Sequence, residues 1–377
     1  MDKTATYLKR GAKTAAVLLA MGSMPVWGQP AVECQSVKIA DPQPFWISSA
    51  AFVAARDRIA VVDPLRNNLL LVSPKGERTE AYDQQLVQPE DQMVPTIIDQ
   101  TNDGFLLSMV DQRLYMLDSN LKPKGNAQNL IKASTGPHGT IVTNYDSVYS
   151  RDELLSFGAV RECSGKFQFG FFRVPLKAPT NFEFLKAVSG GYLDYYLRGH
   201  RYLVGLENGA EYGLIMSPNP VIVQFPAKGA ARPLAVIPDR YRHVPPLKVK
   251  PTGPKSEEAM YKELESLTIP VGLYADGGQG GRDAFLYLLT REPKGNGETL
   301  WNLIQIDPRR GRAVGGPFPL PTTAQHLTIV TSPENWYVFE KGSVEPTGKQ
   351  PIDSLLVIPS SLIRSRSVPA ACRSRLK

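Results

Sequence analysis

Short apolar runs separated by turn residues set the pattern of this chain. The clearest example is Asp57–Lys75, with the sequence DRIAVVDPLRNNLLLVSPK, in which the apolar runs Ile59–Val62 and Leu69–Val72 flank the turn-rich segment DPLRNN. Short runs rich in Val, Ile and Leu and bounded by Asp, Pro and Asn are typical of β-strands joined by a tight turn. The segment is therefore predicted to form a β-hairpin.

The same hairpin recurs in degenerate form through the chain. Its second strand is predicted six times, ending five times in Pro and once in Asp-Ser, at Leu69–Pro74, Arg113–Ser119, Gly170–Pro175, Val221–Pro226, Leu303–Pro308 and Leu355–Pro359. Its first strand is predicted at Arg58–Asp63, Gly104–Asp111, Glu153–Val160, Arg201–Gly209, Ala284–Thr290 and Asn335–Gly342. Proline cannot donate to a strand ladder, so it is expected where a strand ends.

A third strand is expected upstream of each hairpin, and a polar outer strand downstream. The upstream candidates are Phe45–Ser48, Thr96–Asp99, Ile141–Tyr145, Tyr192–Tyr196, Val271–Tyr274 and Leu327–Thr331. An acidic turn residue precedes five of the hairpins: Asp57, Asp103, Asp152, Asp283 and Glu334. Aspartate suits this place because its side chain can accept hydrogen bonds from nearby backbone N–H groups in a turn.

Repetition of a four-stranded unit at intervals of about 50 residues is typical of a β-propeller. The predicted fold class is therefore all-β, a six-bladed β-propeller of four-stranded antiparallel blades. A longer interval before Pro308 holds an insertion between blades four and five, with a short helix predicted over Ser256–Leu264 because Ser precedes acidic residues there. Gln35–Ala40 is expected to add an outer strand to blade six and so to close the ring.

The repeat pattern resembles six-bladed propellers of the TolB-like and NHL-like type. The resemblance covers almost all of the mature chain and is architectural, since no motif of a particular family is present. It implies a rigid ring whose inner strands line a central channel. Propellers include both binding proteins and enzymes, and some lactonase-like members hold a metal ion at the channel mouth, so fold alone does not choose between these functions.

The N-terminal residues have the features of a secretory signal peptide. Lys3, Lys9, Arg10 and Lys13 precede the short apolar stretch Thr14–Met24, and small residues before Gln29 suit a cleavage site after residue 28. We expect a cleaved signal at 1–28, a single propeller domain at 29–363 and a basic tail at 364–377. Glu33 before Cys34 does not suit lipid attachment, so a secreted or periplasmic protein without a transmembrane span is predicted.

Charge and cysteine content add to this picture. The formal net charge of +7 comes mainly from the two ends of the chain, so the propeller body is near neutral and no nucleic-acid partner is expected. The three cysteines are Cys34, Cys163 and Cys372. Closure of the ring would bring the chain ends together, which favours a Cys34–Cys372 disulfide, although a pairing that involves Cys163 stays open.

Acidic residues mark the ends of several predicted inner strands. They are Asp99, Asp146, Asp194 and Asp276, with Asn144 close by. If these side chains converge at the channel mouth, they could bind Ca²⁺ through oxygen ligands; the alternative is that each one ends a strand and caps a turn. No cofactor is otherwise predicted. The segment Tyr192–His200 adds Tyr195, Tyr196 and Arg198 as candidate binding residues, because Tyr and Arg are frequent at binding hot spots.

The sequence carries no strong catalytic motif. It has no GxSxG element, no pair of His at metal-binding spacing and no phosphate-binding loop. The favoured function is a secreted or periplasmic binding or scaffold module, monomeric, which presents a propeller face to a protein, peptide or glycan. The alternative is a metal-dependent hydrolase of the lactonase-like propeller type.

Overall fold

The computed structural model describes most of the chain from Cys34 to Ser367. The described residues are 34–39, 47–63, 68–81, 95–101, 104–109, 113–125, 128–129, 135–136, 139–150, 152–188, 200–206, 208–216, 219–235, 237–245, 248, 254–276, 284–295, 298–341 and 352–367. The predicted signal peptide and Cys372 lie outside them. Among the described helices, none combines the length and the apolar character needed to cross a bilayer.

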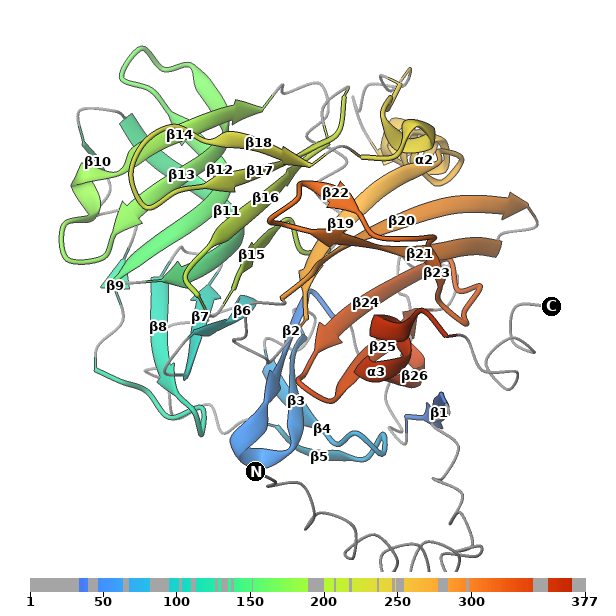
Figure 1. Cartoon of the computed structure of the whole chain (residues 1–377). Helices are drawn as coiled ribbons and strands as arrows, with labels where there is room; N and C mark the ends of the chain where they lie inside the picture. The colour runs from blue at the N-terminus through green and yellow to red at the C-terminus, as the bar shows by residue number, and fades with distance from the viewer. Residues whose placement is uncertain are drawn as a thin grey trace, which may run out of the picture. The chain divides into compact units, whose positions relative to one another are not determined.

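Six antiparallel sheets form the six blades of a β-propeller (Figure 1). Blade one contains β2 (Ser49–Val53), β3 (Arg58–Asp63), β4 (Asn68–Val72) and β5 (Arg78–Ala81). Blade two contains β6 (Pro95–Thr101), β7 (Gly104–Met109), β8 (Arg113–Asp118) and β9 (Gln128–Asn129). Blade three contains β10 (Thr135–Gly136), β11 (Gly139–Ser150), β12 (Glu153–Arg161), β13 (Phe167–Pro175) and β14 (Glu183–Val188).

The second half of the chain supplies the other three blades. Blade four contains β15 (Leu203–Gly205), β16 (Glu211–Ile215), β17 (Val221–Phe225) and β18 (Arg232–Ala235). Blade five contains β19 (Ile269–Ala275), β20 (Leu286–Gly295), β21 (Glu298–Asp307), β22 (Arg312–Ala313) and β23 (Phe318–Pro319). Blade six contains β24 (His326–Thr331), β25 (Asn335–Lys341), β26 (Ile352–Pro359) and β1 (Gln35–Lys38). The predicted all-β, six-bladed fold is confirmed.

Packing between neighbouring blades explains why the apolar runs are continuous. The hairpin of β3 and β4 has the predicted register, with Ile59 opposite Val72. Along β3, Ile59 and Val61 pack in a core shared with blade six, whereas Ala60 and Val62 pack in a core shared with blade two. A strand that is buried on both faces needs apolar side chains at every position, and all four of these residues are fully buried.

The innermost strands of the blades lie around the centre of the ring. They are β2, β6, β11, β15, β19 and β24, and β2 packs against both β6 and β24, so that blade one joins blade six (Figure 1). Strand β1 pairs with β26, with Val37 opposite Leu355, which confirms the predicted closure of blade six by an N-terminal strand. Gly76, at φ +79°, lets a turn of blade one approach this closure: a Cβ there would lie 2.7 Å from the Lys38 carbonyl oxygen.

Two predicted strand assignments are wrong. The first strand of blade one is β2, which follows the predicted Phe45–Ser48 instead of coinciding with it. In blade four, the segment Leu203–Gly205 was expected as part of a second strand, but it is the innermost strand, and Glu211–Ile215 is the second. The predicted inner strand Tyr192–Tyr196 lies outside the described residues.

The acidic turn residues have two physical roles. Asp57 and Asp152 adopt positive φ values of 48° and 63°, a left-handed conformation that Asp tolerates better than most residues. Asp118 instead accepts hydrogen bonds from the backbone N–H groups of Asn120 and Lys122, both at 2.8 Å. Asp118, at the end of β8, is not one of the five predicted turn residues, so the side-chain role is found at a different turn, whereas Asp57 and Asp152 are explained by their backbone conformation.

Two helices follow blades four and six. Helix α2 (Pro254–Glu265) lies between β18 and β19, and its Glu265 contacts Gln325 Nε2 at 2.8 Å and His326 Nε2 at 3.3 Å. Helix α3 (Ser360–Ser365) follows β26 directly, so Arg364, expected in a solvated tail, lies within a helix. Short 3₁₀ helices occur at Ala54–Arg56, Pro179–Asn181 and Asp239–Tyr241.

The predicted Cys34–Cys372 disulfide can be tested by peptide mapping. Cys34 lies directly before β1 and packs against the main hydrophobic core, whereas Cys163 is exposed. We expect non-reducing digestion to yield a peptide that links Cys34 to Cys372. Because a crosslink restricts the unfolded chain, Cys372→Ser should lower the melting temperature, and the control variant Cys163→Ser should leave it unchanged. A peptide that links Cys163 to either terminal cysteine would show that this pairing is wrong.

Candidate functional site

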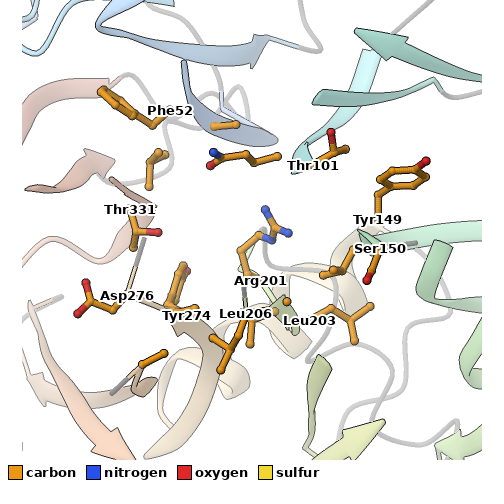
Figure 2. Close-up of a pocket in the computed structure, with 18 of the residues that line it drawn as sticks. Phe52, Thr101, Tyr149, Ser150, Arg201, Leu203, Leu206, Tyr274, Asp276 and Thr331 are labelled. Atoms are coloured by element: carbon orange, nitrogen blue, oxygen red, sulfur yellow. The ribbon is translucent and has the colours of Figure 1, made fainter. Parts of the chain in front are cut away.

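A pocket of about 420 Å³ opens at one end of the ring. All six blades contribute to it, and the residues come from the carboxyl ends of the innermost strands: Ala50–Phe52, Gln100–Thr101, Val148–Ser150, Leu203–Gly205, Tyr274–Ala275 and Ile329–Thr331. Figure 2 shows Arg201 among these residues, with Phe52, Tyr149 and Tyr274 around it. A concave site formed by several elements of a rigid scaffold is the usual place for a ligand.

Arg201 crosses the centre of the ring and joins four blades. It stands two residues before β15 of blade four, and its carbonyl accepts a hydrogen bond from Leu273 N–H on β19 of blade five at 2.7 Å. Its guanidinium Nη2 lies 2.7 Å from Asp99 Oδ1 on blade two, and its Nε lies 3.2 Å from Asp146 Oδ1 on blade three. One side chain therefore connects strands that are distant in the sequence.

The two carboxylates beside Arg201 are deeply buried and fully engaged. The side chains of Asp99 and Asp146 are 1% and 3% exposed. Asp146 Oδ2 accepts hydrogen bonds from the backbone N–H groups of Tyr202 at 2.6 Å and Leu203 at 2.8 Å. Asp99 Oδ2 accepts a hydrogen bond from Ser147 Oγ at 3.0 Å. We call Asp99, Asp146, Ser147 and Arg201 the central ion cluster.

Burial governs the protonation of this cluster. It raises the pKa of Asp99 to about 7, although the nearby Arg201 guanidinium opposes the shift. Burial also raises the pKa of the Asp146 carboxyl, again against Arg201 and the backbone N–H donors. Two carboxylates face one guanidinium, and loss of water disfavours the second negative charge. A proton is therefore held on the pair up to near-neutral pH.

Two further ion pairs compensate the remaining charged side chains of the pocket lining. Asp276, directly after β19, receives two contacts from the Arg364 guanidinium of α3, one of them from Nη2 to Oδ1 at 2.9 Å. Glu211, at the start of β16, binds Arg173 of β13, and both of these side chains are buried. These pairs link blade five to α3 and blade four to blade three.

The structure brings together some of the residues that the sequence singled out. Asp99 and Asp146 meet at Arg201, and Asn144 Nδ2 donates to Ser147 Oγ at 3.2 Å beside them. Asp276 lines the same pocket but binds Arg364 instead. The remaining candidates, Asp194, Tyr195, Tyr196 and Arg198, lie outside the described residues.

Sequence reasoning missed Arg201, the residue at the centre of the site. The shifted assignment in blade four placed it at the start of a second strand, away from the channel. The Asn208-Gly209 pair would have corrected this, because Asn-Gly is a strong β-hairpin turn signal. In the structure, it forms the turn between β15 and β16, and Gly209 has φ +77°.

In this arrangement the carboxylates of Asp99 and Asp146 are directed at the Arg201 guanidinium. Ca²⁺ requires several oxygen ligands that are directed at one point, but Asp99 and Asp146 already bind the Arg201 guanidinium and nearby N–H and O–H donors. Within the described part of the chain, no group of three or more His, Cys, Asp and Glu residues is placed to hold a metal ion. Arg201, a cation of the chain itself, lies between two of the four candidate carboxylates.

Comparison with known proteins shows the fold and nothing more specific. No protein-family model and no curated protein matches the sequence. Among solved structures, a member of the DUF4221 family from Bacteroides vulgatus has a TM-score of 0.55 at 9% identity, over 86% of this chain and 95% of that one. A protein assigned as exported, from Bacteroides fragilis, has a TM-score of 0.50 at 9% identity, over 86% and 94%. A protein assigned as a gluconolactonase has a TM-score of 0.48 at 12% identity, over 88% and 93%.

Removal of the Arg201 charge should destabilise the ring. In Arg201→Met, two buried carboxylates lose their cation, and such a change typically costs about 3–5 kcal/mol. We expect a lower urea midpoint for Arg201→Met than for the wild type. The control Lys177→Met removes an exposed ion pair with Asp152 and should change the midpoint very little. Equal effects of the two substitutions would contradict a structural role for the central ion cluster.

Protonation of Asp99 should make stability depend on pH. Between the unfolded pKa of 3.8 and the folded pKa of about 7, the native state holds a proton that the unfolded state has released. The free energy of unfolding should therefore fall as pH rises across this window. Asp99→Asn removes this contribution, so its stability relative to the wild type should rise from pH 5 to pH 7 in urea titrations.

The matched control for this pH series is Asp118→Asn. Backbone hydrogen bonds, chiefly from Lys122, lower the pKa of Asp118, so this carboxyl does not titrate between pH 5 and pH 8. Its removal should leave the pH slope in that range as in the wild type. Parallel pH profiles for Asp99→Asn and the wild type would show that Asp99 does not bind the extra proton.

Proposed function

We propose that this protein is a secreted or periplasmic binding module, which uses the pocket at the channel mouth to hold part of a protein, peptide or glycan ligand. One observation carries the proposal: residues of all six blades form one pocket around the partly exposed Arg201 side chain, which is 27% exposed. The signal-like N-terminal sequence supports export of the chain, and the sequence contains no catalytic motif.

The closed ring supports a role in binding. Most of the lining residues stand on the innermost strands of the blades, so the pocket does not need to form when the ligand arrives. A preformed site loses little conformational entropy on binding. The walls combine the aromatic rings of Phe52, Tyr149 and Tyr274 with hydroxyl groups such as those of Thr101 and Thr331, a mixture that is common in ligand pockets.

A pocket-filling variant tests this proposal. Gln100 is exposed and lines the pocket, so Gln100→Trp should block the pocket and leave the core intact. We expect ligands from a panel of peptides and oligosaccharides to raise the melting temperature of the wild type, because a ligand stabilises the state that binds it. Gln100→Trp should lose these shifts. Lys186→Trp, on the exposed outer strand β14, should keep them.

The same panel can contradict the binding function. If no ligand gives a shift that depends on Gln100, or if Gln100→Trp and Lys186→Trp respond alike, the pocket is not the binding site. Both variants should first show the circular dichroism spectrum and melting temperature of the wild type without ligand, so that a lost shift reports a blocked pocket.

The second candidate function is a metal-dependent hydrolase of the lactonase-like type. It is motivated by Asp99 and Asp146, whose carboxylates approach the same position. Metal analysis of the purified protein separates the two candidates. The binding function predicts a melting temperature that does not respond to EDTA. Stoichiometric Ca²⁺ that is lost in Asp99→Asn, together with hydrolysis of a lactone, would favour the hydrolase.

A further inference from the structure

Charge compensation around the pocket restricts the kind of ligand that it can hold. Among the described lining residues, only Arg201, Glu211 and Asp276 carry a charge. Glu211 is paired with Arg173, and Asp276 with Arg364. Arg201 is paired with the carboxylates of Asp99 and Asp146, so the three side chains carry at most one excess negative charge. The raised pKa of Asp99 means that this carboxyl holds a proton up to near-neutral pH, which removes the excess charge. The described lining of the pocket therefore offers no unpaired charge to a ligand.

The central ion cluster presents its guanidinium to the pocket and its carboxylates away from it. Asp99 lies one residue before Gln100, and Asp146 lies two residues before Val148, so both carboxylates are deeper than the lining residues. The contacts of Arg201 with the described residues use Nε and Nη2. Its Nη1 group makes none of them, and the side chain is 27% exposed. Nη1 is thus the hydrogen-bond donor available at the base of the pocket.

This arrangement disfavours charged ligands of either sign. A cation at the base would meet the guanidinium first, and an anion would lose its hydration there without meeting a net positive charge, because the guanidinium is already paired with Asp99 and Asp146. Like charges in a partly buried site are costly, because water screens them poorly. A neutral group that accepts a hydrogen bond from Nη1, such as a hydroxyl, an ether or a carbonyl oxygen, avoids both costs.

The pocket is suited to receive the end of a molecule. Arg201 spans from blade four to Asp99 on blade two and to the Ser147 carbonyl on blade three, at 3.3 Å, and so crosses the base of the pocket; Figure 2 shows its side chain in the middle of the lining residues. A chain cannot pass straight through, and a peptide terminus carries a charged amine or carboxylate. The terminal residue of a neutral glycan has only hydroxyl groups, with C–H faces that can pack on rings such as Tyr149 and Tyr274.

We propose that the pocket binds the uncharged terminal sugar of a glycan, with Arg201 Nη1 as a donor to one of its oxygen atoms. This inference rests on the proposed binding function and specifies its ligand. The hydroxyl groups of Ser150 and Thr331 and the amide of Gln100 supply further neutral partners for sugar hydroxyls. The aromatic walls supply the apolar contact.

Matched pairs of sugars test the ligand class. The probes are cellotriose, maltotriose and tri-N-acetylchitotriose, and the same trisaccharides with the terminal sugar oxidised to a uronic acid, each titrated by calorimetry at pH 6 and pH 8. We expect at least one neutral trisaccharide to bind, with its uronate counterpart at least tenfold weaker and weaker still at pH 8. Gln100→Trp should weaken binding of the neutral trisaccharide at least tenfold, and Lys186→Trp should leave it unchanged. Thr331→Trp fills the same pocket from blade six and replaces Gln100→Trp if that variant does not fold.

The outcomes separate this inference from the proposed function. Uronate forms that bind as tightly as the neutral forms, with a loss in Gln100→Trp, would overturn the neutral-ligand inference and leave the binding function standing. Absence of pocket-dependent binding for every trisaccharide would overturn the glycan inference, while peptide shifts in the thermal panel would still support a binding module. Absence of pocket-dependent shifts in both experiments would overturn both.

Discussion

The pairing of β1 with β26 is the constraint on which the rest of this structure depends. A ring of separate sheets is stable only if its first and last blades are joined, and here four residues from the N-terminal side complete the sheet that the C-terminal strands begin. The apolar cores between blades then form a continuous circuit, since every middle strand is covered on both faces. Closure of the ring also holds the pocket in shape, because the lining residues come from all six blades.

Within the closed ring, the central ion cluster fixes how the innermost strands meet. Burial of ionised groups is costly, and this cluster offsets the cost by satisfying each carboxylate from several sides. Asp146 accepts N–H groups from the chain that enters β15, and Asp99 accepts the Ser147 hydroxyl from the neighbouring blade. Burial is the main reason that the pKa of Asp99 is raised, and the neighbouring Asp146 carboxylate adds to the shift. The Asp99 carboxyl at the centre of the ring is therefore expected to release its proton near neutral pH.

The repeat pattern made the fold predictable from the sequence, because every middle strand must be apolar at each position and must end in a turn residue. Ile59–Val62 and Leu69–Val72 therefore stood out, and so did the closing strand near Gln35. Blade four was misassigned because β15 is short and its inner and middle strands differ little in hydrophobicity. The acidic candidates Asp99 and Asp146 could be found because the predicted inner strands end near them, although both residues lie within β6 and β11 in the structure. Their shared partner could not be found in this way, since contact between blades two, three and four depends on the curvature of the whole ring.

The same carboxylates that suggested a metal site in the sequence are explained by a cation that belongs to the chain. A pair of buried acids requires a positive partner, and the sequence pattern does not distinguish a bound ion from a side chain in that role. Arg201 of blade four supplies this positive charge. Its guanidinium differs from a metal ion in one important respect. It donates hydrogen bonds in fixed directions, two of its nitrogens are committed to the inner strands, and the third faces the pocket. The proposed site therefore selects an uncharged ligand by the geometry of its hydrogen bonds, whereas a metal ion would select a ligand by its charge.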